Sequence, residues 1–128
     1  MKPSFFILLA IWISTPISAR AEAIEITNPS WQEVPGTLNP DAEEPYDDPA
    51  YIDVNSIDRG RAIISYDLVS PDGGYVRVET NCDTNQFRAI RKGYFQTTTR
   101  VNYISQIDPW SDATDPYHQA LLSFVCSP

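Results

Sequence analysis

The sequence holds little of what catalytic, metal-binding and nucleic-acid-binding sites are usually built from. It has one histidine, two cysteines, and nine lysines and arginines against seventeen aspartates and glutamates. A Ser-His-Asp triad needs a serine held on a nucleophile elbow, and no such motif is present. A zinc site needs several thiolate or imidazole ligands, which the chain lacks once its cysteines are paired. We therefore predict no enzyme activity, no metal and no cofactor.

The charge balance argues against polyanionic partners. The formal net charge is −8 at pH 7, and it becomes −10 when the leader described next is removed, because that leader carries Lys2, Arg20 and no acidic residue. A surface of this sign repels nucleic-acid phosphates and anionic membranes unless a local basic patch overrides the average. We expect no nucleic-acid partner.

The first 21 residues have the layout of an export signal. Lys2 supplies the positive start, an apolar run follows over 5–13, and small residues come after it. Cleavage after Ala19, Ala21 or Ala23 fits the small-residue rule, and we favour Ala21. The apolar run is far shorter than the ~20 residues that span a bilayer. We predict a signal peptide over 1–21 and a periplasmic or secreted protein with no membrane span after cleavage.

Cys82 and Cys126 are the only cysteines. Exported proteins mature in an oxidising compartment, where an unpaired exposed thiol is a liability. We therefore predict a disulfide between them. No cysteine closely follows the apolar run of the leader, so the mature N-terminus offers no acceptor for a lipid anchor.

Residues 22–128 have the size of one domain, and most of them predict strands. Short β-branched and aromatic runs indicate strands over 31–34, 51–54, 61–69, 75–82, 86–95 and 98–107, after a polar lead-in over 22–30. Turns are expected at 70–74 and 83–85, and Gly93 is expected to mark a bulge. Alternation along two of these strands predicts one core-facing set: Ala62, Ile64, Tyr66, Leu68, Val76, Val78, Thr80 and Cys82.

A helix is expected at the end of the sequence. Asp115 is a good N-cap, and Pro116 fits the first helical position because its missing N–H needs no partner there. An apolar stripe follows at helical spacing: Tyr117, Ala120, Leu121, Phe124 and Val125. The stripe must pack on the sheet. The fold class is therefore α+β, an antiparallel β-meander sheet with a C-terminal helix packed on it and tied by one disulfide.

Prolines and carboxylates crowd residues 35–49, which predicts an exposed acidic, proline-rich loop. Its acidic side chains offer the hard oxygen ligands that Ca²⁺ prefers: Asp41, Glu43, Glu44, Asp47 and Asp48. Their spacing is irregular and the prolines keep most of them from converging. We favour a solvated loop over a calcium site.

Positive charge is concentrated at one place only, which comprises Arg77, Arg88, Arg91 and Lys92. If Arg77 and Arg88 face solvent beside Tyr75, the four side chains form a basic strand face able to bind an acidic glycan or an acidic protein segment. We favour the alternative, ordinary cross-strand pairing with Glu79 and Asp83. The single histidine, His118, we interpret as a surface residue near the dipole-negative end of the short helix.

Several short pieces occur in a characteristic order: Trp31 on the first expected strand, Tyr51-Ile52-Asp53 leading to Ile57, Asn81-Cys82-Asp83 after a hairpin, Arg88 just beyond, and Leu121-x-x-x-Val125-Cys126. In this order and spacing the chain resembles the bacterial surface-adhesin protein E-like family. The resemblance implies a small exported domain with an antiparallel sheet, a C-terminal helix and one disulfide from a strand to the end of the chain. The acidic insertion and the missing lipid-anchoring cysteine depart from that family, so no binding residues are carried over.

These observations predict an exported, non-enzymatic binding module that recognises a cell-envelope or extracellular component. Two other classes stay open: a small exported hydrolase or hydrolase inhibitor that acts through its loops, and a structural subunit of an envelope assembly. A pocket that holds His118 or a perturbed carboxylate would favour an enzyme. A shallow sheet face with tyrosines would favour binding.

Overall fold

The computed structural model describes residues 20–38 and 48–127. Nearly all of the expected signal peptide lies outside these residues. So do Asp41, Glu43, Glu44 and Asp47, and with them the calcium alternative.

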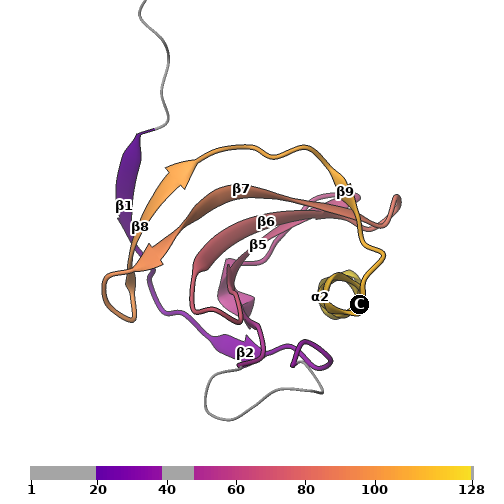
Figure 1. Cartoon of the computed structure of the whole chain (residues 1–128), viewed down its shortest axis with the longest axis horizontal. Helices are drawn as coiled ribbons and strands as arrows, with labels where there is room; N and C mark the ends of the chain where they lie inside the picture. Colours follow the sequence, from indigo (N-terminus) through magenta and orange to yellow (C-terminus); the bar gives the residue numbers. More distant parts are fainter. Residues whose placement is uncertain (1–19, 39–47, 128) are drawn as a thin grey trace, which may run out of the picture.

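The described chain forms one antiparallel sheet and one helix, which confirms the α+β class (Figure 1). The elements are β1 (Ala21–Glu25), β2 (Trp31–Glu33), β3 (Tyr51–Asp53), the 3-10 turn η1 (Val54–Ser56), β4 (Asp58–Arg59), β5 (Ile63–Val69), β6 (Tyr75–Asn81), β7 (Gln86–Phe95), β8 (Arg100–Ser105), β9 (Ser111–Asp112) and α2 (Pro116–Cys126). The strand order is β1-β8-β7-β6-β5-β3-β2, with β4 beside β5 and β9 beside β7. Figure 1 shows the central strands strongly bent, with α2 seen end-on below them.

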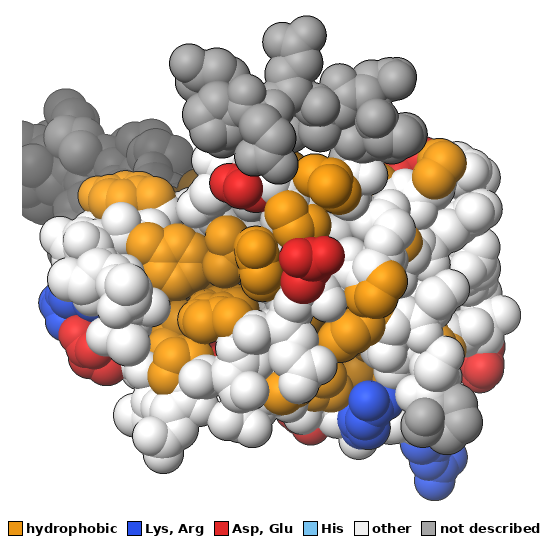
Figure 2. Space-filling model, turned by 90° about the horizontal axis from the view of Figure 1, so that it is seen from below, with side chains coloured by type: hydrophobic (Ala, Val, Ile, Leu, Met, Phe, Trp, Pro, Cys, Tyr) orange, Lys and Arg blue, Asp and Glu red, His pale blue; other side chains and the backbone are white. Residues whose placement is uncertain are grey.

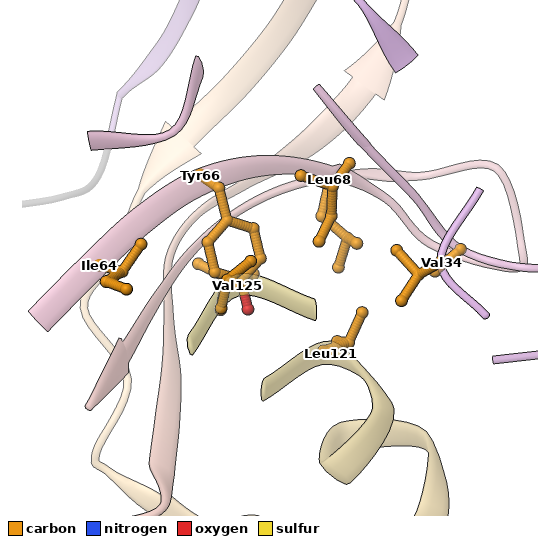
Figure 3. Packing of buried hydrophobic residues seen from close by; sticks show 9 residues of the cluster. Val34, Ile64, Tyr66, Leu68, Leu121 and Val125 are labelled. Atoms are coloured by element: carbon orange, nitrogen blue, oxygen red, sulfur yellow. The ribbon is translucent and has the colours of Figure 1, made fainter. Parts of the chain in front are cut away.

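One face of the sheet, called here the helix face, carries Ile64, Tyr66, Leu68 and Val78 and packs on α2. The predicted alternation of β5 and β6 is confirmed, because Val76, Cys82 and the buried Thr80 also lie on this side. Figure 3 shows side chains of β5 directed toward Leu121 and Val125 of α2. The hydroxyl groups of Tyr66 and Thr80, both buried, satisfy each other at 2.8 Å.

The predicted helix is confirmed, with Asp115 as N-cap and Pro116 at its start. Asp115 accepts a hydrogen bond from the backbone N–H of His118, which satisfies one of the free donors of the first turn. Leu121 and Val125 of the predicted stripe are buried, and Leu122 is buried beside them. The predicted disulfide joins Cys82 to Cys126 and ties the helix end to the end of β6.

The other face of the sheet, called here the opposite face, carries the alternate side chains, among them Asp67, Tyr75 and Tyr103. We expected Tyr75 to face solvent, and this is wrong because only 1% of it is exposed. A second core of Tyr75, Val101 and Tyr103 forms here, covered by Ile24, Ile26 and Phe95. The connection from β1 to β2 runs between the two edges of the sheet across this face.

The N-terminal segment also differs from the prediction. Residues 22–30 are not a lead-in throughout, because β1 pairs with β8 in register from Ala21 opposite Ile104 to Glu25 opposite Arg100. Part of the loop over 35–49, which was expected to be exposed, is also buried. Thr37 is 5% exposed, and its hydroxyl donates to the Val34 carbonyl and accepts from the Ala50 N–H.

The irregularity of β7 lies three residues before the predicted position. Arg77 of β6 stands opposite Arg91 and Val78 opposite Ala89, so Ile90 is the extra residue of the bulge. Gly93 has another role, since a Cβ there would lie 1.9 Å from the Asn102 carbonyl oxygen of β8. Glycine at this position permits the close approach of two strands.

Candidate functional site

The predicted basic side chains are held by partners inside the protein. Arg77, on the opposite face, donates from Nη1 to Asp67 Oδ1 at 3.0 Å, and its side chain is 17% exposed. Its other terminal nitrogen donates to Ser65 Oγ at 3.0 Å. Asp67 also accepts the Tyr75 hydroxyl at 2.8 Å. Arg77 therefore belongs to a buried polar network and is not a surface cation.

Arg91 joins this network from β7. Its guanidinium carbon lies 4.9 Å from the centre of the Tyr103 ring. Burial lowers the pKa of Arg91, but its hydrogen bond with Tyr75 and the nearby negative charge of Asp67 outweigh this, so the net shift is upward. Burial, followed by the charge of Asp67, raises the pKa of Tyr75 well above its ordinary value. The phenol therefore stays protonated as a donor to Asp67.

The other two basic residues lie on different faces of β7. Arg88 bonds Glu79 at 2.8 Å and stacks over Trp110, with 4.3 Å from the guanidinium carbon to the ring centre. Lys92 lies on the helix face and pairs with Asp108 at 2.7 Å. The expectation that all four share one solvent-facing strand surface is thus wrong in its geometry. Arg88 instead forms the cross-strand ion pair with Glu79 that was the alternative prediction.

A cavity of about 260 Å³ lies between α2 and the helix face of the sheet. Its walls come from three elements of the chain: the sheet, the first turns of α2, and the segment that runs from β8 into β9. Most of the lining is apolar: Leu68, Val76, Val78, Phe87, Ala89, Pro109, Tyr117 and Leu121. Polar groups enter the lining from Ser70, Arg88, Asp108, Ser111 and His118. An apolar cavity with a few polar side chains is the usual form of a small-molecule site.

His118 forms part of this cavity, at the opposite end of the helix from where we placed it. It is the third residue of α2, close to the dipole-positive N-terminus, and its side chain is only 29% exposed. Its ring stacks on Phe87 with 3.8 Å between ring centres and 9° between planes. Its Nδ1 lies 2.7 Å from Asp115 Oδ1. Asp115 therefore both caps the helix and fixes the orientation of the imidazole.

Two further carboxylates lie beside the cavity. Asp108 lines it directly, and Asp72 accepts a hydrogen bond from Ser70 Oγ, which also lines it. The pKa of Tyr117 depends on these surroundings. Burial first, and then the negative charges of Asp72 and Asp115, raise the pKa of Tyr117 to about 12. Asp72 and Asp115 therefore both act on the Tyr117 phenol.

A second hollow of about 330 Å³ lies at the far end of the sheet. It is lined by Trp31, Val69, Phe95 and the turn residues 96–98. The rings of Trp31 and Phe95 meet edge to face at 5.9 Å, which links β2 to the end of β7. Figure 2 shows hydrophobic side chains gathered on the face of the molecule seen from below, where β2 lies in Figure 1. This hollow has no charged side chain in its lining.

Among residues 20–38 and 48–127, no three His, Cys, Asp or Glu side chains come together as a metal site. No helix formed by these residues is long and apolar enough to cross a membrane.

No local pattern in the sequence indicates the cavity, because its walls are contributed by residues that range from Leu68 to Leu121. The segment Asp108-Pro109-Trp110 follows the strand expected over 98–107. It runs along the edge of β7, where the Asp108 N–H donates to the Ala89 carbonyl oxygen at 2.9 Å, and closes one wall. Comparison with family models, with curated proteins and with solved structures finds no match to this chain.

Proposed function

We propose that the protein is an exported, non-enzymatic binding module, and that the cavity under α2 receives an apolar group of its ligand. The cavity is the observation that carries this proposal. It is preformed, it is bounded by secondary structure on two sides, and its apolar walls lie next to hydrogen-bonding side chains.

The energetics of such a cavity favour a small apolar group. Each 100 Å² of apolar surface removed from water contributes about 2.5 kcal/mol, less the free energy of immobilising the ligand. Three interactions hold α2 in place as a wall of the cavity. They are the disulfide, the Asp115 cap, and a hydrogen bond from Arg59 Nη1 to the Val125 carbonyl oxygen at 2.7 Å. A rigid cavity binds without first having to order its walls.

The setting of the cavity supports an extracellular or envelope partner. A disulfide is stable in the periplasm or outside the cell, and the leader expected over 1–21 would direct the chain there. The resemblance to the surface-adhesin protein E-like family supports the same kind of role, a module that recognises an envelope or extracellular component.

A substitution that fills the cavity tests the proposal. Ala89 lies on the helix face of β7 and lines the cavity, so Ala89→Leu would occupy part of its volume. We expect this variant to raise the free energy of unfolding by about 0.5 to 2 kcal/mol and to weaken binding of small aromatic probes at least tenfold. Denaturant unfolding and ligand-observed NMR with a panel of benzene derivatives measure the two effects.

Ala62→Leu is the matched control, because Ala62 is half-buried but does not line the cavity. Probe binding should survive this change. Equal probe binding by wild type and Ala89→Leu would overturn the proposal.

Hydrolysis is the second candidate, and one observation favours it. The cavity is lined in part by His118, whose Nδ1 is bonded to Asp115, which leaves Nε2 as the ring nitrogen that could act as a base. Among the described residues, however, no serine hydroxyl is hydrogen-bonded to His118, and Ser70 Oγ is bonded to Asp72 instead. Hydrolysis of p-nitrophenyl acetate at a rate that falls to background in His118→Gln would favour this candidate over simple binding.

A further inference from the structure

We propose that the ligand of the cavity under α2 is a small primary amine with an apolar body, whose ammonium group lies at the mouth between Asp72 and Asp115. This inference rests on the proposed function and specifies the chemistry of its ligand. Three features carry it: the distribution of charge around the mouth, the geometry of the groups that hold the two carboxylates, and the volume.

The first feature is a shortage of cations on this side of the molecule. Arg88 is bonded to Glu79, and Lys92 is bonded to Asp108. Asp72 has no lysine or arginine partner among the ion pairs of the described residues, and Asp115 pairs only with His118. Asp72 therefore brings to the mouth a negative charge that no ion pair of the described residues neutralises, and such a charge attracts a cation and repels a carboxylate.

The second feature is that both carboxylates are fixed and both are tied to lining side chains. Asp115 is held by the N–H of His118 at 3.0 Å and by its ring nitrogen. Asp72 accepts from Ser70 Oγ and, at 3.0 Å, from the backbone N–H of Gly74. Ser70 and His118 both line the cavity. A ligand in the cavity thus has two preorganised acceptors at its opening, one from the turn between β5 and β6 and one from the helix.

The electrostatics of Tyr117 agree with this arrangement. Tyr117 lines the cavity, and its phenol experiences the negative charges of both Asp72 and Asp115. The two carboxylates are therefore close enough to act on one point at the cavity wall. An ammonium group placed there would experience attraction from both.

The third feature is size. A volume of about 260 Å³ corresponds to about eight or nine water molecules at ~30 Å³ each, which is the scale of one aromatic ring with a short side chain. The stacked rings of Phe87 and His118 form part of the wall, so a flat apolar body fits the lining.

Three probes of nearly equal size and different charge test the proposal: 2-phenylethylamine, 2-phenylethanol and phenylacetate. We expect the amine to bind about three- to tenfold more tightly than the alcohol, because two partly exposed carboxylates attract its ammonium group. The carboxylate should bind most weakly. Raising the ionic strength should reduce the difference between amine and alcohol, since it screens the charges. Isothermal titration calorimetry and ligand-observed NMR give the affinities.

Two substitutions test whether the preference for the amine over the alcohol arises from the carboxylates at the mouth of the cavity. Asp72→Asn and Asp115→Asn remove the charges, and asparagine preserves both the turn and the helix cap. The double variant should bind the amine and the alcohol equally while retaining the melting temperature of the wild type within a few degrees. Asp58→Asn is the matched control, because it removes one charge from the exposed β4 and should leave the amine preference unchanged.

The outcomes separate this inference from the proposed function. Equal binding of amine and alcohol by the wild type, or tighter binding of phenylacetate, would overturn the amine and leave an apolar binding cavity. An amine preference that the double variant retains would also overturn it, because the charge would then act elsewhere. If the three probes and the benzene derivatives all fail to bind, both proposals fall.

Discussion

Replacing Asp67 by alanine is expected to lower the free energy of unfolding by about 3 to 5 kcal/mol, the usual result of removing one partner of a buried ion pair. The Asp67 side chain is 9% exposed and accepts from both Tyr75 and Arg77. Without it the Arg77 guanidinium would remain buried with no counter-charge, and the Tyr75 hydroxyl would lose its acceptor. Urea unfolding followed by tryptophan fluorescence measures the loss.

Glu79→Ala provides the comparison. Glu79 pairs with Arg88 on the adjacent strand β7, but the Glu79 side chain is 23% exposed and the Arg88 side chain 26%, and Arg88 retains its contact with Trp110. Water can replace much of what the carboxylate provided, so we expect a loss of about 1 kcal/mol or less. If Asp67→Ala proves no more destabilising than Glu79→Ala, the network around Asp67 is not the internal support that we infer.

Removing the disulfide is the second substitution with a large expected effect. The bridge spans 44 residues of sequence and joins the end of β6 to the last turn of α2. We expect the double variant Cys82→Ala, Cys126→Ala to lose about 2 to 5 kcal/mol, mainly because the unfolded chain gains freedom. The helix should then exchange its amide protons faster than the central strands, since it depends on packing of Leu121 and Val125 and on the Arg59 hydrogen bond.

Two measurements accompany that variant. Thiol titration of the native protein under denaturing, non-reducing conditions should find no free thiol. The double variant should also lose the binding of aromatic probes, because α2 forms one wall of the cavity. Two titratable thiols in protein purified from its own compartment would contradict the pairing.

Patterns of local origin were predicted well from the sequence. The alternation of β5 and β6 identified Ile64, Tyr66, Leu68 and Val78 as core residues, because a side chain's face follows from its position in the strand. The helix start at Pro116 was equally clear, since an N-cap followed by proline acts within one turn. The turn at 70–74 was predicted for the same reason, and Gly73 adopts there the positive φ of 88° that glycine permits.

Features that depend on distant parts of the chain were missed. The sequence of β1 has few strand-forming side chains, and only its pairing with β8 makes it a strand. The arginines were expected to face water because alternate residues of an antiparallel sheet commonly do. Arg77 instead pairs with Asp67 and donates to the Ser56 carbonyl oxygen of η1, so it is largely buried on that face. The cavity could not be predicted because strands, helix and connecting segment form it together.

β1 would also limit when the leader predicted from the sequence could be removed. Two of the three candidate cleavage points, after Ala21 and after Ala23, lie within this strand. A protease needs an unpaired, accessible backbone, and β8 removes that backbone when it pairs with β1. The partner of Glu25 is Arg100, 75 residues further along the chain, so β1 cannot pair until β8 is available. If the predicted leader is cleaved at Ala21 or Ala23, cleavage would have to precede this pairing, whereas cleavage after Ala19 would not.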